Sequence, residues 1–197
     1  MGAILQSLGR TVIAGIVLLV IIIILAGVLS GHFITPNEGY WTFFMRWLHV
    51  LSGVMWIGLL WYFNFVQIPS MPKIPDEQKP AIGKVIAPTA LFWFRWAALS
   101  TVVTGLLLAG MNRYLIQALT FNPGSYAIGI GMWLGLIMAF NVWFIIWPNQ
   151  KKALGIVQVA ADEKAKAARL AMLTSRLNTV LSIPMLYCMV GQSHGGF

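Results

Sequence analysis

Three histidines are the residues of this sequence best suited to chemistry: His32, His49 and His194. His49 lies seven residues into an apolar stretch that begins near Thr42, so a helix would place it ~10 Å below one membrane surface. An ionisable side chain at that depth is unfavourable and marks a functional site by default. The alternative is a neutral histidine that hydrogen-bonds a neighbouring helix.

His194 is the natural partner for His49. It follows Arg176 by eighteen residues, which corresponds to ~27 Å of helix and brings it toward the same membrane side. Two neutral imidazoles on different helices are the ligands that a bis-histidine haem b requires. We therefore predict one haem b, with His49 and His194 on its iron. His194 in a frayed tail, or His32 in its place as second ligand, are the alternatives.

Two further residues belong to this predicted haem site. Gly53 lies four residues after His49, hence on the same helix face, and leaves room for a flat macrocycle. Small residues also permit close helix crossings, which is the alternative for Gly53. Arg46, near the outer surface, is a candidate partner for a haem propionate. A bis-histidine iron has no open position, which favours one-electron transfer over oxygen binding.

A second group of polar residues is expected at the opposite side of the membrane. Its members sit at comparable depths in apolar stretches: Arg95, Asn141, Asn64 and Asn178. No carboxylate occurs in those stretches, so the direct interpretation is a structural cluster in which amide and backbone oxygens hold the arginine. A bound lipid headgroup or a quinone is the functional alternative.

The composition fixes the class of protein that must position these residues. Of 197 residues, 59% are hydrophobic and 9% are charged, whereas soluble domains carry about 25% charged residues. A soluble enzyme, a disordered chain and a disulfide scaffold are therefore excluded, and a polytopic membrane protein remains. The single cysteine, Cys188, also excludes covalent haem attachment through Cys-x-x-Cys-His.

Five apolar stretches approach the ~20 residues that a membrane-spanning helix needs. They cover about residues 12–29, 42–65, 88–111, 126–147 and 177–192. We predict an all-α fold, a bundle of five transmembrane helices forming one membrane domain over residues 1–197, with the first helix retained. A loop with a short helical turn is expected at 67–87 and a short loop at 112–125. A polar helix, continuous with the fifth span, is expected within 148–176. No internal repeat is obvious.

The charges predict the orientation. With five helices, the N-terminus and the segments 67–87 and 148–176 share one face. Ten basic residues lie there: Arg10, Lys73, Lys79, Lys84, Lys151, Lys152, Lys164, Lys166, Arg169 and Arg176. The other face has only Arg113 and Arg46. This asymmetry predicts a cytoplasmic N-terminus and a periplasmic C-terminus, and it explains the net charge of +8 without nucleic acid.

Several segments resemble one known family. They are RWLHVLSGVMWIGLLWYFNFVQIP, FWFRWAALSTVVTGLLL, FNVWFIIWPNQKKALG and SRLNTVLSIPMLYCMVGQSH. These segments are similar to the bacterial membrane-bound urate hydroxylases, also described as the urate oxidase N-terminal membrane domain. Longer members carry a cytochrome c domain and a histidine-rich insertion. No such segment is found before Phe197, so a short form is expected.

The function expected from residues and resemblance together is a haem b subunit of a bacterial inner-membrane respiratory or photosynthetic complex. It would transfer electrons on the periplasmic side to a cytochrome c or to partner subunits, without catalysis of its own. The alternatives are a cytochrome-c-linked urate oxidase, which the resemblance implies, and a structural subunit without cofactor.

Overall fold

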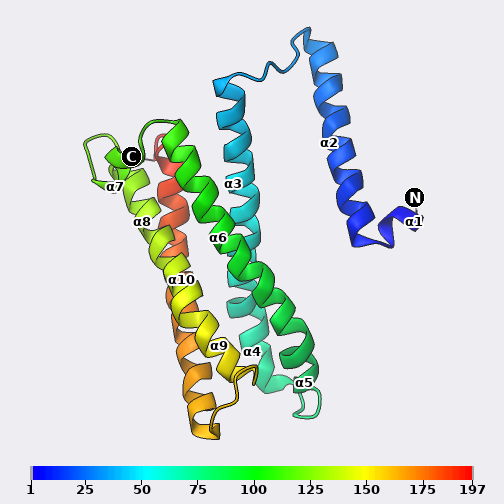
Figure 1. Ribbon diagram of the computed structural model, residues 1–197, viewed down its shortest axis with the longest axis vertical. Coiled ribbons are helices and arrows are strands. Elements are labelled where there is room, and N and C mark those ends of the chain that lie inside the picture. The colour runs from blue at the N-terminus through cyan, green and yellow to red at the C-terminus, as the bar shows by residue number, and fades with distance from the viewer. Residues whose placement is uncertain (1, 197) are drawn as a thin grey trace. The chain divides into compact units, whose positions relative to one another are not determined.

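The computed structural model describes residues 2–196, which form helices and connecting turns without a strand (Figure 1). The predicted all-α fold is therefore confirmed. The chain divides into two compact units, one ending at Trp41 and the other beginning at Thr42.

The first unit is built on one long apolar helix. A short helix, α1 (Gly2–Leu5), precedes α2 (Leu8–Ser30), which ends at Gly31 in the left-handed conformation that commonly terminates helices. Gly27 is the buried residue of α2, because the Phe33 ring folds back on it: a Cβ there would lie 2.8 Å from Phe33 Cδ1. Most other residues of α2 between Val12 and Leu29 are apolar and exposed, as suits lipid.

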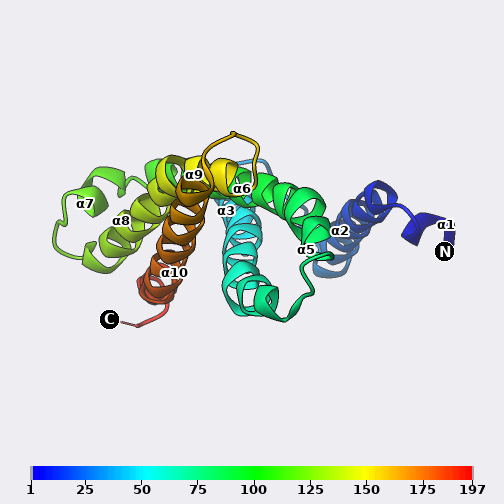
Figure 2. The same cartoon turned by 90° about the horizontal axis from the view of Figure 1, so that it is seen from below.

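The second unit contains four long helical runs, seen from two directions in Figures 1 and 2. Their parts are, in order, α3 (Glu38–Trp61), η1 (Tyr62–Gln67), α4 (Ile68–Ser70) and η2 (Met71–Lys73); α5 (Lys79–Ala81), η3 (Ile82–Ile86) and α6 (Ala87–Met111); α8 (Tyr126–Phe140), η4 (Asn141–Ile146) and α9 (Trp147–Ala153); and α10 (Ala161–Gly191). A short helix, α7 (Leu115–Leu119), links the second run to the third.

Prolines explain why three of these runs contain π-helical segments. η1, η3 and η4 each end two positions before a proline, at Pro69, Pro88 and Pro148. A proline has no N–H to donate and its ring clashes with the carbonyl four residues earlier. Widening the preceding turn to the i→i+5 pattern moves that carbonyl away, so the helix continues instead of breaking.

The core of the second unit lies where these runs cross. Trp56, Leu60, Phe94 and Met138 are each at most 2% exposed. They come from α3, α6 and α8, and Met185 of α10 packs on the same cluster. The core therefore fixes α3 and α6 against α8 and α10 at mid-height, while most outward-facing side chains are apolar.

Of two expectations about the spans and their connections, the structure leaves the first unconfirmed and corrects the second. Within residues 2–196, four helices are long and apolar enough to cross a membrane: Leu8–Ser30, Glu38–Lys73, Lys79–Met111 and Tyr126–Ala153. The predicted count of five is thus not confirmed, because the apolar part of α10 covers only Leu177–Gly191. Those fifteen residues give ~22 Å of helix, short of the ~30 Å hydrocarbon core.

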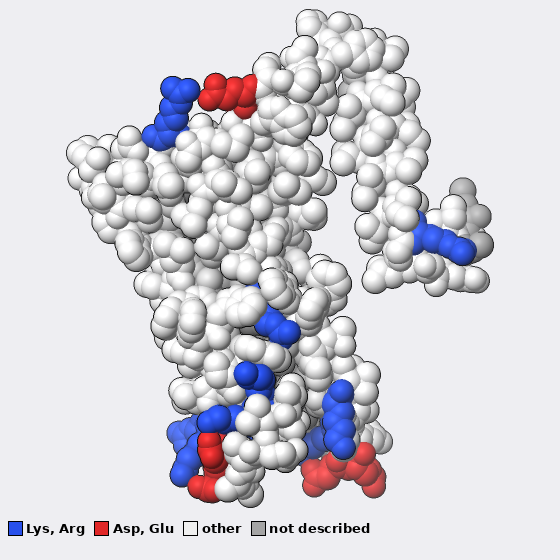
Figure 3. Space-filling model, in the orientation of Figure 1, with Lys and Arg blue, Asp and Glu red and all other residues white. Residues whose placement is uncertain are grey.

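The structure corrects the prediction of a loop at residues 67–87. Most of it is helical, and only residues 74–78 connect η2 to α5. By contrast, the polar helix expected within 148–176 is present and continues into the fifth apolar stretch as α10. In the second unit, basic side chains gather at the end where α4, α5, α9 and the start of α10 lie (Figure 3). Exposed ion pairs such as Lys152–Glu163 (2.6 Å) occur among them.

Candidate functional site

His49 projects from α3 against α6 and is held there by hydrogen bonds. Its Nδ1 lies 2.9 Å from the carbonyl oxygen of Thr101 and 3.3 Å from Thr104 Oγ1. Because a carbonyl can only accept, Nδ1 carries the proton and Nε2 carries the lone pair. Donation of one ring N–H to a backbone carbonyl is also how proteins orient histidines that bind metals through the other nitrogen.

Gly105 makes room for this histidine, and the sequence analysis missed its role. A Cβ at Gly105 would lie 2.7 Å from His49 Cε1, closer than van der Waals contact permits. The imidazole therefore packs directly on the α6 backbone. The sequence signal was a glycine inside the apolar run TVVTGLLL, but nothing in it identified His49 as the residue that needs the space.

Gly53 serves the same helix crossing. A Cβ there would lie 3.9 Å from Thr101 Cγ2, so the helix face beside His49 meets α6. The residues directly before Gly53 and Thr101 also meet, since the hydroxyls of Ser52 and Ser100 are 2.8 Å apart. A Cβ at 3.9 Å would make an ordinary van der Waals contact, so both alternatives for Gly53 stay open.

Arg46 is exposed on α3 and lies near Tyr114, just beyond the end of α6. Burial raises the pKa of the Tyr114 hydroxyl, and the positive charge of Arg46 partly opposes that rise. Arg46 thus belongs to the end of the second unit opposite the basic cluster, as the sequence predicted.

The other two histidines have local partners. His194 is exposed just after α10, with Nδ1 3.0 Å from the Val190 carbonyl oxygen. His32 belongs to the first unit, where its Nδ1 is 2.7 Å from the Ser30 carbonyl oxygen. In the neutral form of each ring, a carbonyl partner at Nδ1 places the proton on Nδ1 and the lone pair on Nε2. Among the described residues, no contact between two of these histidines is shown.

His49 has several properties that an axial ligand of haem iron requires. A half-buried, neutral imidazole with a fixed ring and an Nε2 lone pair fits one axial position, and His49 has these properties. Within residues 2–196 there is also no group of three His, Cys, Asp or Glu side chains that could hold a metal ion directly.

The inner polar cluster is built on α10. Asn141 Nδ2 donates to Asn178 Oδ1 at 2.8 Å, and Asn178 Nδ2 donates to the Met138 carbonyl at 3.0 Å. One turn away, Asn64 Nδ2 donates to Ser175 Oγ at 2.8 Å. The asparagines of η1 and η4 thus meet consecutive turns of one α10 face, all at least nine-tenths buried.

Arg95 does not join these asparagines. Its guanidinium lies 3.8 Å from the centroid of the Trp147 ring and 5.6 Å from that of Phe92. Aromatic faces, rather than amide oxygens, therefore receive its positive charge. The position of Trp147 in the sequence, four residues before Lys151, did not indicate a contact with Arg95.

Helices of this length and apolar character define a multi-pass membrane-type protein. Its C-terminal part, residues 114–196, matches the family model described as urate oxidase N-terminal. The match includes α8, α9, α10 and His194, and it confirms the predicted resemblance over that part of the chain. No curated protein and no solved structure matches the chain.

Proposed function

We propose that this chain is a membrane electron-transfer subunit that binds one haem b, with His49 as an axial ligand. The observation that carries the proposal is the His49 Nδ1 hydrogen bond to the Thr101 carbonyl, because it leaves Nε2 available as a donor. A bound haem would supply one-electron redox chemistry. Thr101 and Thr104 would hold the imidazole plane, and Gly105 would set its distance from α6.

The second ligand belongs to the same proposal. We propose His194, with His32 as the alternative, and Arg46 as a partner for a propionate. The chain would lie in the bacterial inner membrane with its N-terminus cytoplasmic and its C-terminus periplasmic, as the positive-inside rule predicts. A periplasmic cytochrome c or other complex subunits would then exchange electrons near the outer surface.

The family match over residues 114–196 favours a second candidate, a cytochrome-c-linked membrane urate oxidase. The two candidates differ in what reduces the haem. The test is a reduced-minus-oxidised spectrum of the purified protein, followed by anaerobic addition of urate with cytochrome c. Haem reduced by dithionite but not by urate supports the electron-transfer subunit. Urate-dependent reduction of cytochrome c supports the oxidase, and a protein without haem would leave a structural subunit.

A further inference from the structure

Two parts of the second unit repeat one another. The segments Met55–Asn64 and Met132–Asn141 align without a gap as MWIGLLWYFN and MWLGLIMAFN, with six of ten residues identical. Each segment leads into a π-helical stretch, η1 or η4, and then into a helix with proline at its start. Both asparagines are buried and donate to α10. The second unit therefore divides into two helical hairpins, each beginning with a helix that carries one copy of this segment. Membrane proteins built from repeats place ligands where the repeats meet.

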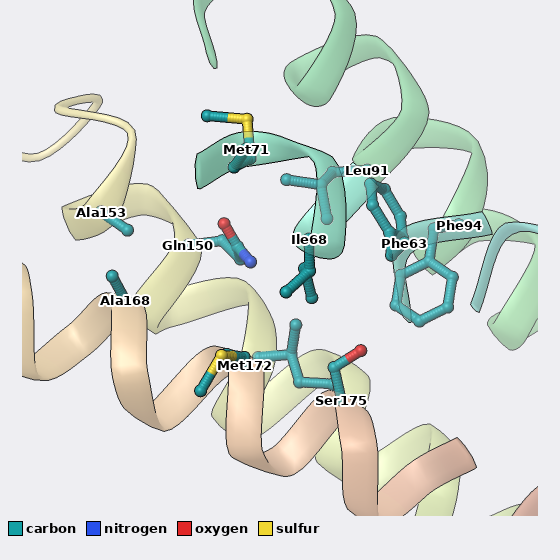
Figure 4. Close-up of a pocket in the computed structure, with 11 residues that line it drawn as sticks. Phe63, Ile68, Met71, Leu91, Phe94, Gln150, Ala153, Ala168, Met172 and Ser175 are labelled. Carbon is teal, nitrogen blue, oxygen red and sulfur yellow. The ribbon is translucent and has the colours of Figure 1, made fainter. Parts of the chain in front are cut away.

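A cavity of about 300 Å³ lies at that meeting point (Figure 4). Phe63 and Met71 line it from the first hairpin, Gln150 and Met172 from the second. Phe63 and Phe94 form an edge-to-face pair, with centroids 5.7 Å apart, at one wall. The volume is at the small end of the range for ligand pockets, which suits a single substituted ring.

The lining is neutral, with hydrogen-bond donors on one side. None of the lining residues is charged, so an anion or a cation would be left without a counter-charge. The Gln150 amide extends into the space in Figure 4. Ser175 lines the cavity on α10; its Oγ accepts from Asn64, which leaves its hydroxyl hydrogen available to donate. Amide and hydroxyl donors suit carbonyl oxygens.

Two buried acceptors in the adjoining π-helical segment are unsatisfied. Asn64 Oδ1 and Gln67 Oε1 have no hydrogen-bond partner within the described residues. They belong to η1, which lines the cavity through Phe63, and Gln67 precedes the lining residue Ile68. Buried acceptors of this kind are rare in folded proteins. Their missing partner must be a hydrogen-bond donor, such as the hydroxyl of a quinol, the reduced form of a quinone.

We propose that this cavity binds the ring of a lipid-soluble quinone: a neutral, flat headgroup with carbonyl oxygens and an apolar tail. The aromatic and methionine walls would enclose the ring, and Gln150 and Ser175 would donate to its carbonyls. The proposal is independent of the haem proposal, since it uses other residues and a different end of the bundle.

The test measures binding of decylubiquinone, a benzoquinone with a ten-carbon tail, to the purified full-length chain in detergent by isothermal titration. Ala168→Phe, at the cavity rim, should weaken binding at least about 10-fold through steric exclusion. The matched control Ala165→Phe, one turn earlier on α10 and exposed, should leave binding unchanged. Gln150→Met should weaken it about 3- to 10-fold, the effect of one lost hydrogen bond. Gln117→Met, at an exposed position of α7, should not weaken it.

Competition between ligands identifies the class of molecule that the cavity binds. A decylbenzene without carbonyl oxygens should bind at least about 3-fold more weakly than the quinone. Equal binding of that analogue would mean that the cavity accepts an acyl chain, and the quinone proposal would be wrong. Displacement by urate, an anion at neutral pH, or the absence of saturable quinone binding would overturn it too. A protein without haem would contradict the proposed function but leave this test intact.

Discussion

The packing of His49 on α6 predicts the effect of one added methyl group. In Gly105→Ala the new Cβ would lie 2.7 Å from His49 Cε1 and 3.1 Å from its Nδ1. At these distances the imidazole ring must move away from the new methyl group. The hydrogen bond to the Thr101 carbonyl oxygen opposes that movement. Either the hydrogen bond breaks or α3 moves away from α6.

Gly110, in the same helix, is a matched reference from which the loss of stability caused by the clash can be estimated. A Cβ at Gly110 meets nothing within 4 Å, so Gly110→Ala gains helix propensity without a clash. Both variants gain up to about 1 kcal/mol of propensity, and this term cancels when they are compared. The remaining difference is the overpacking at His49, about 1–3 kcal/mol, including the lost hydrogen bond of about 1 kcal/mol.

The assay is reversible unfolding of the purified protein by titration with a denaturing detergent, followed by circular dichroism. Gly105→Ala should unfold at a lower denaturant fraction than wild type, and Gly110→Ala at the same or a higher one. Equal stability of the two alanine variants would refute the placement of His49 against Gly105. Restoration of stability in Gly105→Ala by His49→Ala would support it, because the clash partner is then removed.

Three further predictions concern other contacts. Asn141→Ala and Asn178→Ala should each destabilise the protein, with a coupling of about 0.6–1.7 kcal/mol in a double-mutant cycle; additive effects would contradict their hydrogen bond. Arg95→Leu and Trp147→Leu should couple by about 0.5–2 kcal/mol, and a coupling near zero would rule out the 3.8 Å stacking. The raised pKa of Tyr114 means that its neutral form is favoured on folding, so this contribution to stability is present below pH 10 and lost as the pH rises above it. Stability measured between pH 9 and 11 should therefore fall less in Tyr114→Phe than in wild type, and identical pH curves would contradict this.

The sequence predicted the helical class and the positions of the long helices, because apolar stretches in lipid have few alternatives to helix. It also placed Asn64, Asn141 and Asn178 in one cluster from their depth alone, and these residues do converge on α10. The depth of Arg95 in the membrane did not predict its partners. Its contact with Trp147 depends on how the helices are rotated and how they cross, which the sequence does not show.

Other features depended on tertiary contacts that no local pattern encodes. The four prolines within residues 67–87 favoured a loop, whereas the structure places Pro69, Pro72 and Pro80 in the first turns of short helices. The π-helical segments η1 and η4 also helped to reveal the repeat, because each follows one of the two matching segments, Met55–Asn64 and Met132–Asn141. His49 was identified as a buried histidine, but its partners Thr101 and Gly105 are more than fifty residues away and have no distinguishing sequence signal.

The central claim is that His49 binds haem iron through Nε2. It is tested most directly by the visible spectrum of His49→Ala beside that of the wild-type protein, both purified from membranes at equal yield. The claim predicts a low-spin haem b spectrum in the wild type that is lost in the variant while the variant still inserts. An unchanged low-spin spectrum in His49→Ala, or a wild-type protein without haem, would contradict it.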